Sequence, residues 1–332
     1  MRALSFFLRP AAVCLALVLV VGGWASAAEA ANCDGNVSNL VFGDVDLLDG
    51  DAVSAAATLT FGCSAQPGDQ VLICVGMGAN PAAPGMGSMV PRYLKANSGQ
   101  VGDLAFNLYR DPAHNEIWGD FGSAGYPPKA YVMQFGAGQY YLKQTSTVYG
   151  QIKSQGQTSL PSGLYNTTAI GNWPVHMRVK TFTGATPPAC STGGMSEQSS
   201  NFYIAATVKK DCRIDAVSDL DFGTVFQTLD QNIDSTATLT VTCTSDAWAN
   251  YQVSLGDGRH ANGTQRRMQG PGGGFLDYGL FTDAARTEPW PANGVTQTGS
   301  GQQQLRVYGR VPPQTVPAPG VYSDTVVVTV SY

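Results

Sequence analysis

Cysteine is the residue type whose number and spacing point most directly to chemistry in this sequence. The 332-residue chain has seven cysteines, and Cys14 lies within an apolar N-terminal run. Residues 1–27 combine Arg2 and Arg9, that apolar run and a small-residue cleavage site, which is the pattern of a signal peptide. An even number of cysteines in an exported chain is typical of disulfides. The sequence therefore predicts three disulfides among the remaining cysteines: Cys33, Cys63, Cys74, Cys190, Cys212 and Cys243.

The other reactive side chains do not form a catalytic or metal-binding pattern. His114, His176 and His260 are isolated in the sequence and lack the spacing of a zinc site. The acidic run at residues 43–51 misses the ligand spacing of a calcium-binding EF-hand loop. Gly-x-Ser-x-Gly and His-Glu-x-x-His motifs are absent. We therefore expect no enzyme activity, no metal and no cofactor.

The charge of the chain argues against nucleic acid as a partner. Its formal net charge is −5, and removal of Arg2 and Arg9 with the signal peptide lowers it to about −7. A protein that binds nucleic acid or an anionic membrane normally carries a basic surface. We expect neither of these partners.

A repeat in the sequence narrows the disulfide pairing. Residues 33–64 and 212–245 both begin with Cys, continue through Leu-x-Phe-Gly and end after Thr-Leu-Thr-x-x-Cys. The two cysteines of each copy are 30 and 31 residues apart. This spacing predicts one disulfide within each copy, Cys33–Cys63 and Cys212–Cys243, which leaves Cys74 and Cys190 for each other.

The composition and the length of the repeat favour two all-β domains. Charged residues make up only 13% of the chain, while 39 glycines and 19 prolines supply turns. A repeat of this length is a duplicated domain, because solenoid units are much shorter. Short strand patterns separated by turn residues indicate antiparallel β-sandwiches. We place the first domain at residues 28–208 and the second at residues 209–332.

The C-terminal run has the alternation of a half-buried β-strand. In residues 320–332, one set of alternating positions is apolar or aromatic, and the other holds mainly Ser and Thr. The first set consists of Tyr322, Val326, Val328, Val330 and Tyr332. The chain thus ends on one of its most strand-like segments.

Several motifs of the second copy together resemble one known family. FYIAATVKKDC, LDFGTV, TATLTVTC, GLFTDAARTEPW, VYGRVP and PGVYSDTVVVTVSY resemble the spore coat protein U domain, which occurs in the pilins of archaic (Csu-type) chaperone-usher pili. The resemblance covers residues 201–332 and is weaker over residues 33–186. A two-domain chain of this kind looks like the tip adhesin of such a pilus.

The resemblance implies an immunoglobulin-like sandwich that lacks its last strand. Its open groove would be bordered by Val326, Val328, Val330 and Tyr332, and an unpaired sheet edge beside an apolar groove can accept a strand from another chain. The implied partners are a periplasmic chaperone, an outer-membrane usher and an adjacent pilin subunit that donates a strand. The implied location is the cell surface, reached through the periplasm.

The region before Cys33 bears on the position of the chain in a fibre. After cleavage, only a few residues would precede Cys33, fewer than a donated strand needs. We therefore expect a subunit that accepts a strand without donating one, which belongs at the pilus tip. Residues 202–208 could complete the first domain by pairing with residues 173–182, or could equally be the first strand of the second domain.

Apolar residues in the glycine-rich loops of the first domain are candidates for surface binding. Exposed apolar clusters often mark contact sites, and the resemblance implies a hydrophobic surface or an unknown receptor as the target; alternatively, these residues could cover the ends of the sandwich. Two other functions are considered. One is a secreted coat or matrix protein, and the other is a lectin that stacks sugars on Trp118, Trp173 and Tyr126. The candidate residues are Met77, Met86, Met89, Val90, Phe121, Tyr126, Tyr140 and Tyr141.

Overall fold

A computed structural model describes residues 31–79, 89–97, 102–168, 171–225, 228–244, 250–299 and 301–332. The expected signal peptide and Met86 lie outside these residues. In the described part, the regular elements are β-strands and one 3₁₀ turn, η2 (Pro271–Gly273). No helix in that part has the length and hydropathy needed to cross a membrane.

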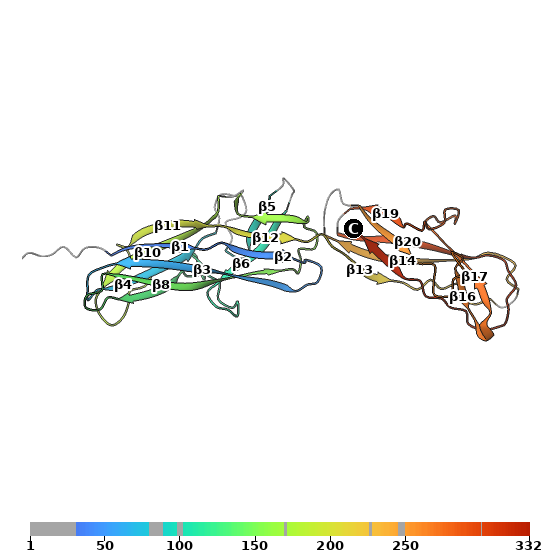
Figure 1. Ribbon diagram of the computed structural model, residues 1–332, viewed down its shortest axis with the longest axis horizontal. Coiled ribbons are helices and arrows are strands. Elements are labelled where there is room, and N and C mark those ends of the chain that lie inside the picture. The colour runs from blue at the N-terminus through green and yellow to red at the C-terminus, as the bar shows by residue number, and fades with distance from the viewer. Residues whose placement is uncertain are drawn as a thin grey trace, which may run out of the picture.

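The first domain is a sandwich of two sheets, as the alternating sequence pattern predicts (Figure 1). The larger sheet has the order β1-β3-β8-β6-β5-β9-β12-β2, and the smaller has the order β11-β10-β4-β7. The strands of the larger sheet are β1 (Asn32–Val37), β2 (Leu40–Val45), β3 (Ala52–Ser64), β5 (Arg92–Ala96), β6 (Asp103–Tyr109), β8 (Tyr141–Lys153), β9 (Gly163–Asn166) and β12 (Ile204–Val208). Those of the smaller sheet are β4 (Gln70–Met77), β7 (Lys129–Gln134), β10 (Trp173–Phe182) and β11 (Ser196–Phe202).

The second domain is a smaller sandwich with the same plan. One sheet has the order β13-β14-β20-β18, the other has the order β19-β15-β21, and β16 pairs with β17 in a two-stranded sheet. Their bounds are β13 (Cys212–Val217), β14 (Ile233–Cys243), β15 (Asn250–Leu255), β16 (Arg267–Gln269), β17 (Phe275–Asp277), β18 (Gly279–Phe281), β19 (Val295–Thr298), β20 (Gly301–Val311) and β21 (Val328–Ser331). The expectation of an all-β chain with two sandwich domains is confirmed.

Each domain has its own hydrophobic core between its sheets. In β14 the burial alternates along the strand, so that Leu239, Val241 and Cys243 face inward. In the first domain, β1 and β3 place Cys33 directly opposite Cys63. Alternate side chains of a strand lie on the same face of the sheet. The cysteines share the inward face with the apolar residues, so each disulfide lies at the core.

The three disulfides have the pairing that the repeat predicts. Cys33–Cys63 and Cys212–Cys243 each join directly opposed residues of a strand pair, with Cα atoms 4.1 Å apart. Cys74–Cys190 connects β4 to the segment between β10 and β11. In the chain-entropy estimate, closing a loop of about thirty residues stabilises a domain by roughly 3 to 4 kcal/mol.

The two domains lie end to end and meet at a short junction (Figure 1). After β12, the backbone N–H of Lys209 donates to the carbonyl of Val45, 3.0 Å away. Arg213 of the second domain donates to the carbonyl of Leu48 in the first. These contacts tie Lys209 and Arg213 to the end of β2 and the segment that follows it.

Candidate binding site: the open edge of the second domain

Strand β21 lies at the edge of its sheet. It pairs with β15 on one side, from Gln252 opposite Ser331 to Leu255 opposite Val328. In the described residues, no strand pairs with its other side. An unpaired edge presents free N–H and C=O groups to which an extended segment of another chain can add.

The inward face of this C-terminal run is only half covered. Val326, Val328 and Val330 are half-buried and pack against the second core, while Tyr332 is 54% exposed. Val327, on the opposite face, is 66% exposed. The alternation predicted from the sequence is present, and it leaves a row of valines that one more strand would cover.

Strand β13 forms the edge of the facing sheet. It pairs with β14 alone, and its Cys212 and Ile214 are half-buried. The following Leu-x-Phe-Gly segment forms no strand, and its Leu220 and Phe222 are half-buried against the second core. We call the unpaired side of β21, together with Ile214, Leu220 and Phe222, the open edge.

In the first domain, a strand lies beside the Leu-x-Phe-Gly segment, where the second domain has its open edge. Its Leu-x-Phe-Gly segment forms β2, which pairs in parallel with β12. Leu40 is 0% and Phe42 is 7% exposed there. These two side chains are buried, whereas Leu220 and Phe222 are half-exposed, because the described part of the second copy has no strand in the place of β12.

Residues 202–208 belong to the core of the first domain, but their predicted partner was wrong in part. Phe202, the last residue of β11, lies opposite Trp173 of β10 as expected. Residues 204–208, however, form β12, which pairs with β9 and β2. The chain thus changes partner at residue 203. Up to Phe202 it pairs with β10, and from Ala205 it pairs with β9, the strand that precedes β10 in the sequence.

Hydrogen bonds order the polar groups near the open edge. The Tyr332 hydroxyl donates to Asp211 Oδ1 at 2.5 Å, and this hydrogen bond, followed by desolvation, raises the pKa of Tyr332. The Tyr278 hydroxyl donates to Asp324 Oδ2 at 2.7 Å, and burial raises the pKa of Tyr278. These two hydrogen bonds hold the C-terminal run near both of its ends.

The expected surface-binding residues do not form one patch. Met77 was wrongly expected at the surface: it is 0% exposed because β4 continues through it into the core. Met89, Phe121 and Tyr126 are half-buried. The residues that are exposed as expected are Val90 at 40%, Tyr140 at 61% and Tyr141 at 56%.

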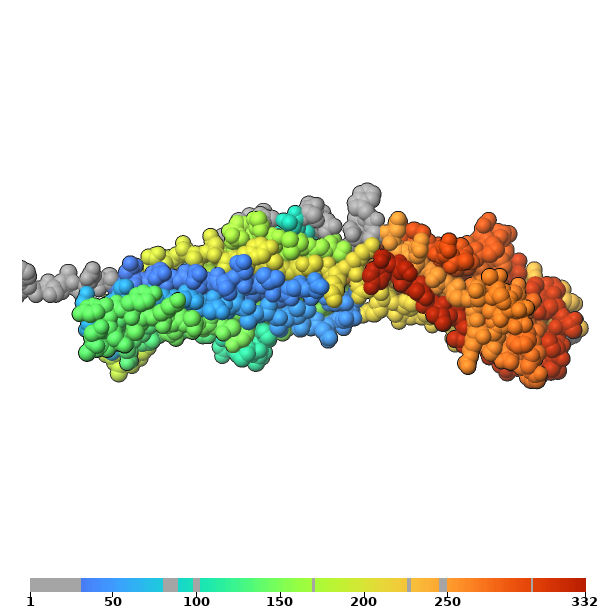
Figure 2. Space-filling view, in the orientation of Figure 1, coloured from blue at the N-terminus to red at the C-terminus, as the bar shows by residue number. Residues whose placement is uncertain are grey.

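The exposed tyrosines lie at the end of the first domain that is remote from the second. Tyr141 opens β8 and pairs with Ser64, and the backbone N–H of Ala65 donates to the carbonyl of Tyr140. Figure 2 shows this segment, in green, covering the far end of the molecule. Met89 and Val90 lie instead beside the other end of β4, where Arg92 donates both to the carbonyl of Met77 and to Met89 Sδ.

The two tryptophans considered for sugar stacking are buried. Trp118 is 0% and Trp173 is 1% exposed. Their Nε1 groups donate to the carbonyls of Val75 at 2.8 Å and Gly78 at 2.7 Å. A buried indole that satisfies its N–H inside the core offers no face to a sugar, so this part of the lectin hypothesis was wrong.

One histidine has a partner that the sequence did not reveal. His176 Nδ1 lies 2.7 Å from Asp120 Oδ2, and the two residues are 56 positions apart. The described residues hold no group of three or more His, Cys, Asp or Glu side chains arranged to bind a metal. Because these two residues are adjacent in space but far apart in the sequence, no spacing pattern could have predicted their contact.

The fold and the repeated domain plan define the class of this protein. The Spore Coat Protein U domain matches residues 23–171 and 198–329, which together make up well over half of the chain. The chain belongs to the Spore Coat Protein U domain family, a class of structural, non-enzymatic domains.

Two solved structures to which the chain is similar are bacterial tip subunits. The CsuC–CsuE chaperone–tip adhesion subunit complex of Acinetobacter baumannii is 17% identical, with 91% of this chain and 100% of that chain covered and a TM-score of 0.49. The CupB6 tip adhesin from Pseudomonas aeruginosa is 10% identical, with 91% and 94% covered and a TM-score of 0.40. No curated protein matches the sequence significantly.

Proposed function

We propose that this protein is the tip adhesin of a chaperone-usher pilus and that it joins the fibre by accepting a β-strand at the open edge. The observation that carries the proposal is the difference between the two copies of the domain. The first is completed by its own β11 and β12, while in the described residues of the second copy β21 pairs on one side only and no strand covers Leu220 and Phe222. A chain built in this way can be completed at its second domain by another polypeptide.

The proposal includes the route of assembly. A periplasmic chaperone covers the open edge during export, an outer-membrane usher passes the subunit to the surface, and the adjacent pilin then supplies the permanent strand. Family membership, the predicted signal peptide and the three disulfides support export through an oxidising compartment.

The first domain then carries adhesion, with surface attachment and biofilm formation as the outcome. Tyr140 and Tyr141 are the exposed aromatic side chains at its far end, and Val90 adds an exposed apolar side chain at the other end of β4. Aromatic side chains can bury a large apolar area against a hydrophobic surface. The buried Trp118 and Trp173 make a lectin the weaker alternative.

Co-expression with a periplasmic chaperone tests the proposed anchoring. We expect a stable one-to-one complex that survives size-exclusion chromatography. Val328→Asp should abolish it, because the aspartate would lie on the half-buried face that the added strand covers. Val327→Asp is the matched control, since Val327 is 66% exposed on the opposite face, and it should leave the complex intact. A monomeric wild-type chain, or equal behaviour of the two variants, would refute strand acceptance at this edge.

A further inference from the structure

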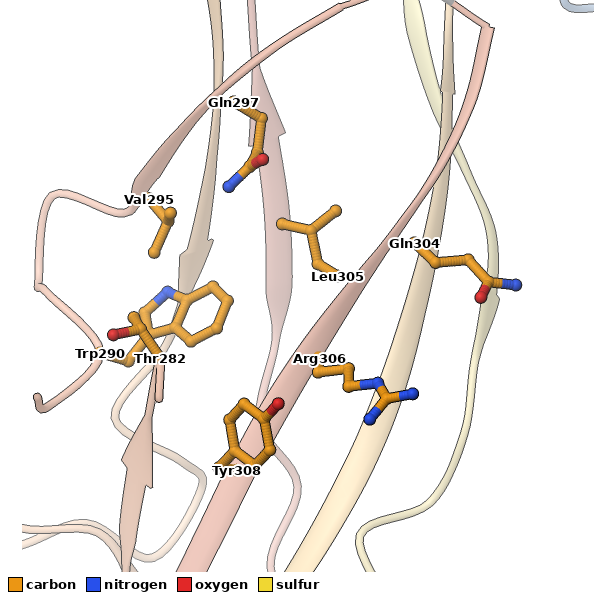
Figure 3. Close-up of a pocket in the computed structure, with 8 residues that line it drawn as sticks. All are labelled: Thr282, Trp290, Val295, Gln297, Gln304, Leu305, Arg306 and Tyr308. Atoms are coloured by element: carbon orange, nitrogen blue, oxygen red, sulfur yellow. The ribbon is translucent and has the colours of Figure 1, made fainter. Parts of the chain in front are cut away.

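A pocket lies on the side of the second domain away from the open edge. It has a volume of about 370 Å³ and lies between β19 and β20 (Figure 3). Trp290, Val295, Gln297 and Leu305 are among its lining residues, and Trp290 is 5% exposed. Strand β18 pairs with β20 only from Tyr308 onward, so the N-terminal part of β20 has an unpaired edge beside the pocket in the described structure.

The first domain contains the same position, built on an equivalent tryptophan. Trp118 Nε1 donates to the carbonyl of Val75, and Trp290 Nε1 donates to the carbonyl of Val253 at 3.2 Å. These two valines lie opposite Lys129 and Val295 in their sheets. Lys129 of the first domain therefore stands where the second domain has Val295.

Lys129 fills this position in the first domain. Its Nζ lies 5.1 Å from the ring centroid of Trp118 and 5.5 Å from that of Tyr131. It donates to the carbonyl of Arg110 at 3.3 Å and to Ser146 Oγ at 3.4 Å. An ammonium group over an aromatic face is attracted by the ring's negative face, most strongly when both are partly desolvated.

The second domain lacks both side chains that close this position. Val295 replaces Lys129, and Gln297, opposite Tyr251 in the sheet, replaces Tyr131, which lies opposite Ile73. The shorter valine does not reach across Trp290, and the ring of Tyr131 has no counterpart. The pocket thus lies at the position where the first domain has the side chains of Lys129 and Tyr131.

The charged residues around this position differ between the two domains. In the matching turns LYRD and LFTD, Thr282 replaces Arg110, so one positive neighbour of Lys129 is removed. The carboxylate of Glu116, which pairs with Arg110 at 3.3 Å, is retained as Glu288. Arg306 also lines the pocket, and its guanidinium extends from β20 away from the indole of Trp290 (Figure 3).

We infer that this pocket binds the side chain of a lysine presented by a partner polypeptide, with its ammonium over the face of Trp290. The partner's extended backbone can then run along the unpaired edge of β20. The carbonyl of Thr282 takes the place of the Arg110 carbonyl that accepts from Lys129. This surface lies on the opposite side of the sandwich from the open edge, so the inference does not depend on strand acceptance there.

An NMR titration of the full mature chain tests the inference. The probe is Nα-acetyl-lysine methylamide, followed through the indole N–H resonance of Trp290. We expect saturable binding with a dissociation constant in the millimolar range, on the order expected for one cation–π contact and a few buried methylenes. The uncharged Nα-acetyl-norleucine methylamide keeps the four side-chain carbons of lysine and lacks the ammonium group, and it should bind at least about tenfold more weakly. Equal binding of the two probes would overturn the cationic specificity.

Two reciprocal substitutions provide matched controls. Val295→Lys copies the first domain and should abolish binding by filling the pocket from within. Lys129→Val should create a second site, seen as a shift of the Trp118 indole resonance on addition of the same probe. Glu288→Gln removes an exposed carboxylate of the turn that follows Thr282 and should weaken binding severalfold; this variant is the test if Val295→Lys does not fold. Unchanged binding in folded Val295→Lys, or in Glu288→Gln when that variant is needed, would refute the site.

Discussion

Single residues in the two copies keep the same local geometry even where their types differ. His114 and Arg286 occupy the same place in the matching turns and have φ values of 57° and 58°. This left-handed region is costly for a residue with a side chain. Each turn is held by an aspartate three residues earlier, since Asp111 accepts from the N–H of Glu116 and Asp283 accepts from the N–H of Glu288. The carboxylate therefore compensates for a conformation that the residue itself disfavours.

The acid stability of the second domain should depend on Asp283. The hydrogen bond from Glu288 N–H, followed by bonds from Thr287, lowers the pKa of Asp283 below its ordinary value of 3.8. A carboxyl group with a lowered pKa in the folded state stabilises the fold above its ordinary pKa and loses that effect as the pH falls through the lowered value. Asp283→Asn should therefore lower the Tm at pH 7, and the difference from wild type should narrow below about pH 4.

Thermal unfolding followed by circular dichroism from pH 7 to pH 2 measures this effect. Asp219→Asn is a control at an exposed position of the same domain. A difference between wild type and Asp283→Asn that is constant over the whole range would show that the turn is not held by the ionised carboxylate.

At the scale of elements, the main difference between the domains is one strand. Strand β12 covers Leu40 and Phe42 in the first domain, and its Ile204, Ala206 and Val208 are buried in that core. The second domain ends its sheet at β21 and leaves Leu220 and Phe222 half-buried. The same Leu-x-Phe-Gly motif is thus a strand in one copy and an irregular segment in the other, because a strand requires a partner for its backbone groups.

Matched leucine substitutions should report this difference in free energy of unfolding. Leu40→Ala should destabilise the first domain by about 3 kcal/mol, because Leu40 is completely buried. In the free chain, Leu220→Ala should lower the free energy of unfolding by less than this, since Leu220 is only half-buried. Once a strand covers the open edge, the same substitution should lower the free energy of unfolding by more than it does in the free chain. Urea denaturation of the full chain, alone and bound to a chaperone, provides the measurement. An equal cost in both states for Leu220→Ala would mean that the bound partner does not cover this side chain.

At the scale of the whole molecule, the candidate sites lie at different places along an elongated chain. Tyr140 and Tyr141 are at the far end of the first domain, while the open edge and the pocket lie in the second (Figures 1 and 2). The end-to-end arrangement keeps the far end clear of any partner bound to the second domain. Adhesion and anchoring can therefore be separated by mutation.

Replacement of both tyrosines tests this separation. Tyr140→Ala combined with Tyr141→Ala should reduce attachment to polystyrene severalfold, because it removes the two aromatic side chains exposed at the far end. Formation of the chaperone complex should not change. Val321→Ala removes an 85% exposed apolar side chain from the second domain and should leave attachment intact. Undiminished attachment of the double variant would place adhesion elsewhere on the chain.

The sequence alone determined the features that depend on local pattern and on the repeat. Alternation of apolar and polar residues predicted β14 and a strand in the C-terminal run, since successive side chains of a strand face opposite ways. Within that run, the strand β21 covers only Val328–Ser331. The similar spacing within the two copies predicted Cys33–Cys63 and Cys212–Cys243, because each pair closes the same hairpin-like arrangement of strands.

Only the tertiary structure decided which side chains the sheets bury and which partners the strands take. Met77 and Trp118 lie in or beside segments rich in glycine and resembled loop residues, yet the sandwich closes over both. The partners of β12 and the contact between Trp118 and Lys129 join segments that are distant in sequence. Such contacts depend on how the sheets stack, which is a property of the whole domain and leaves no local pattern.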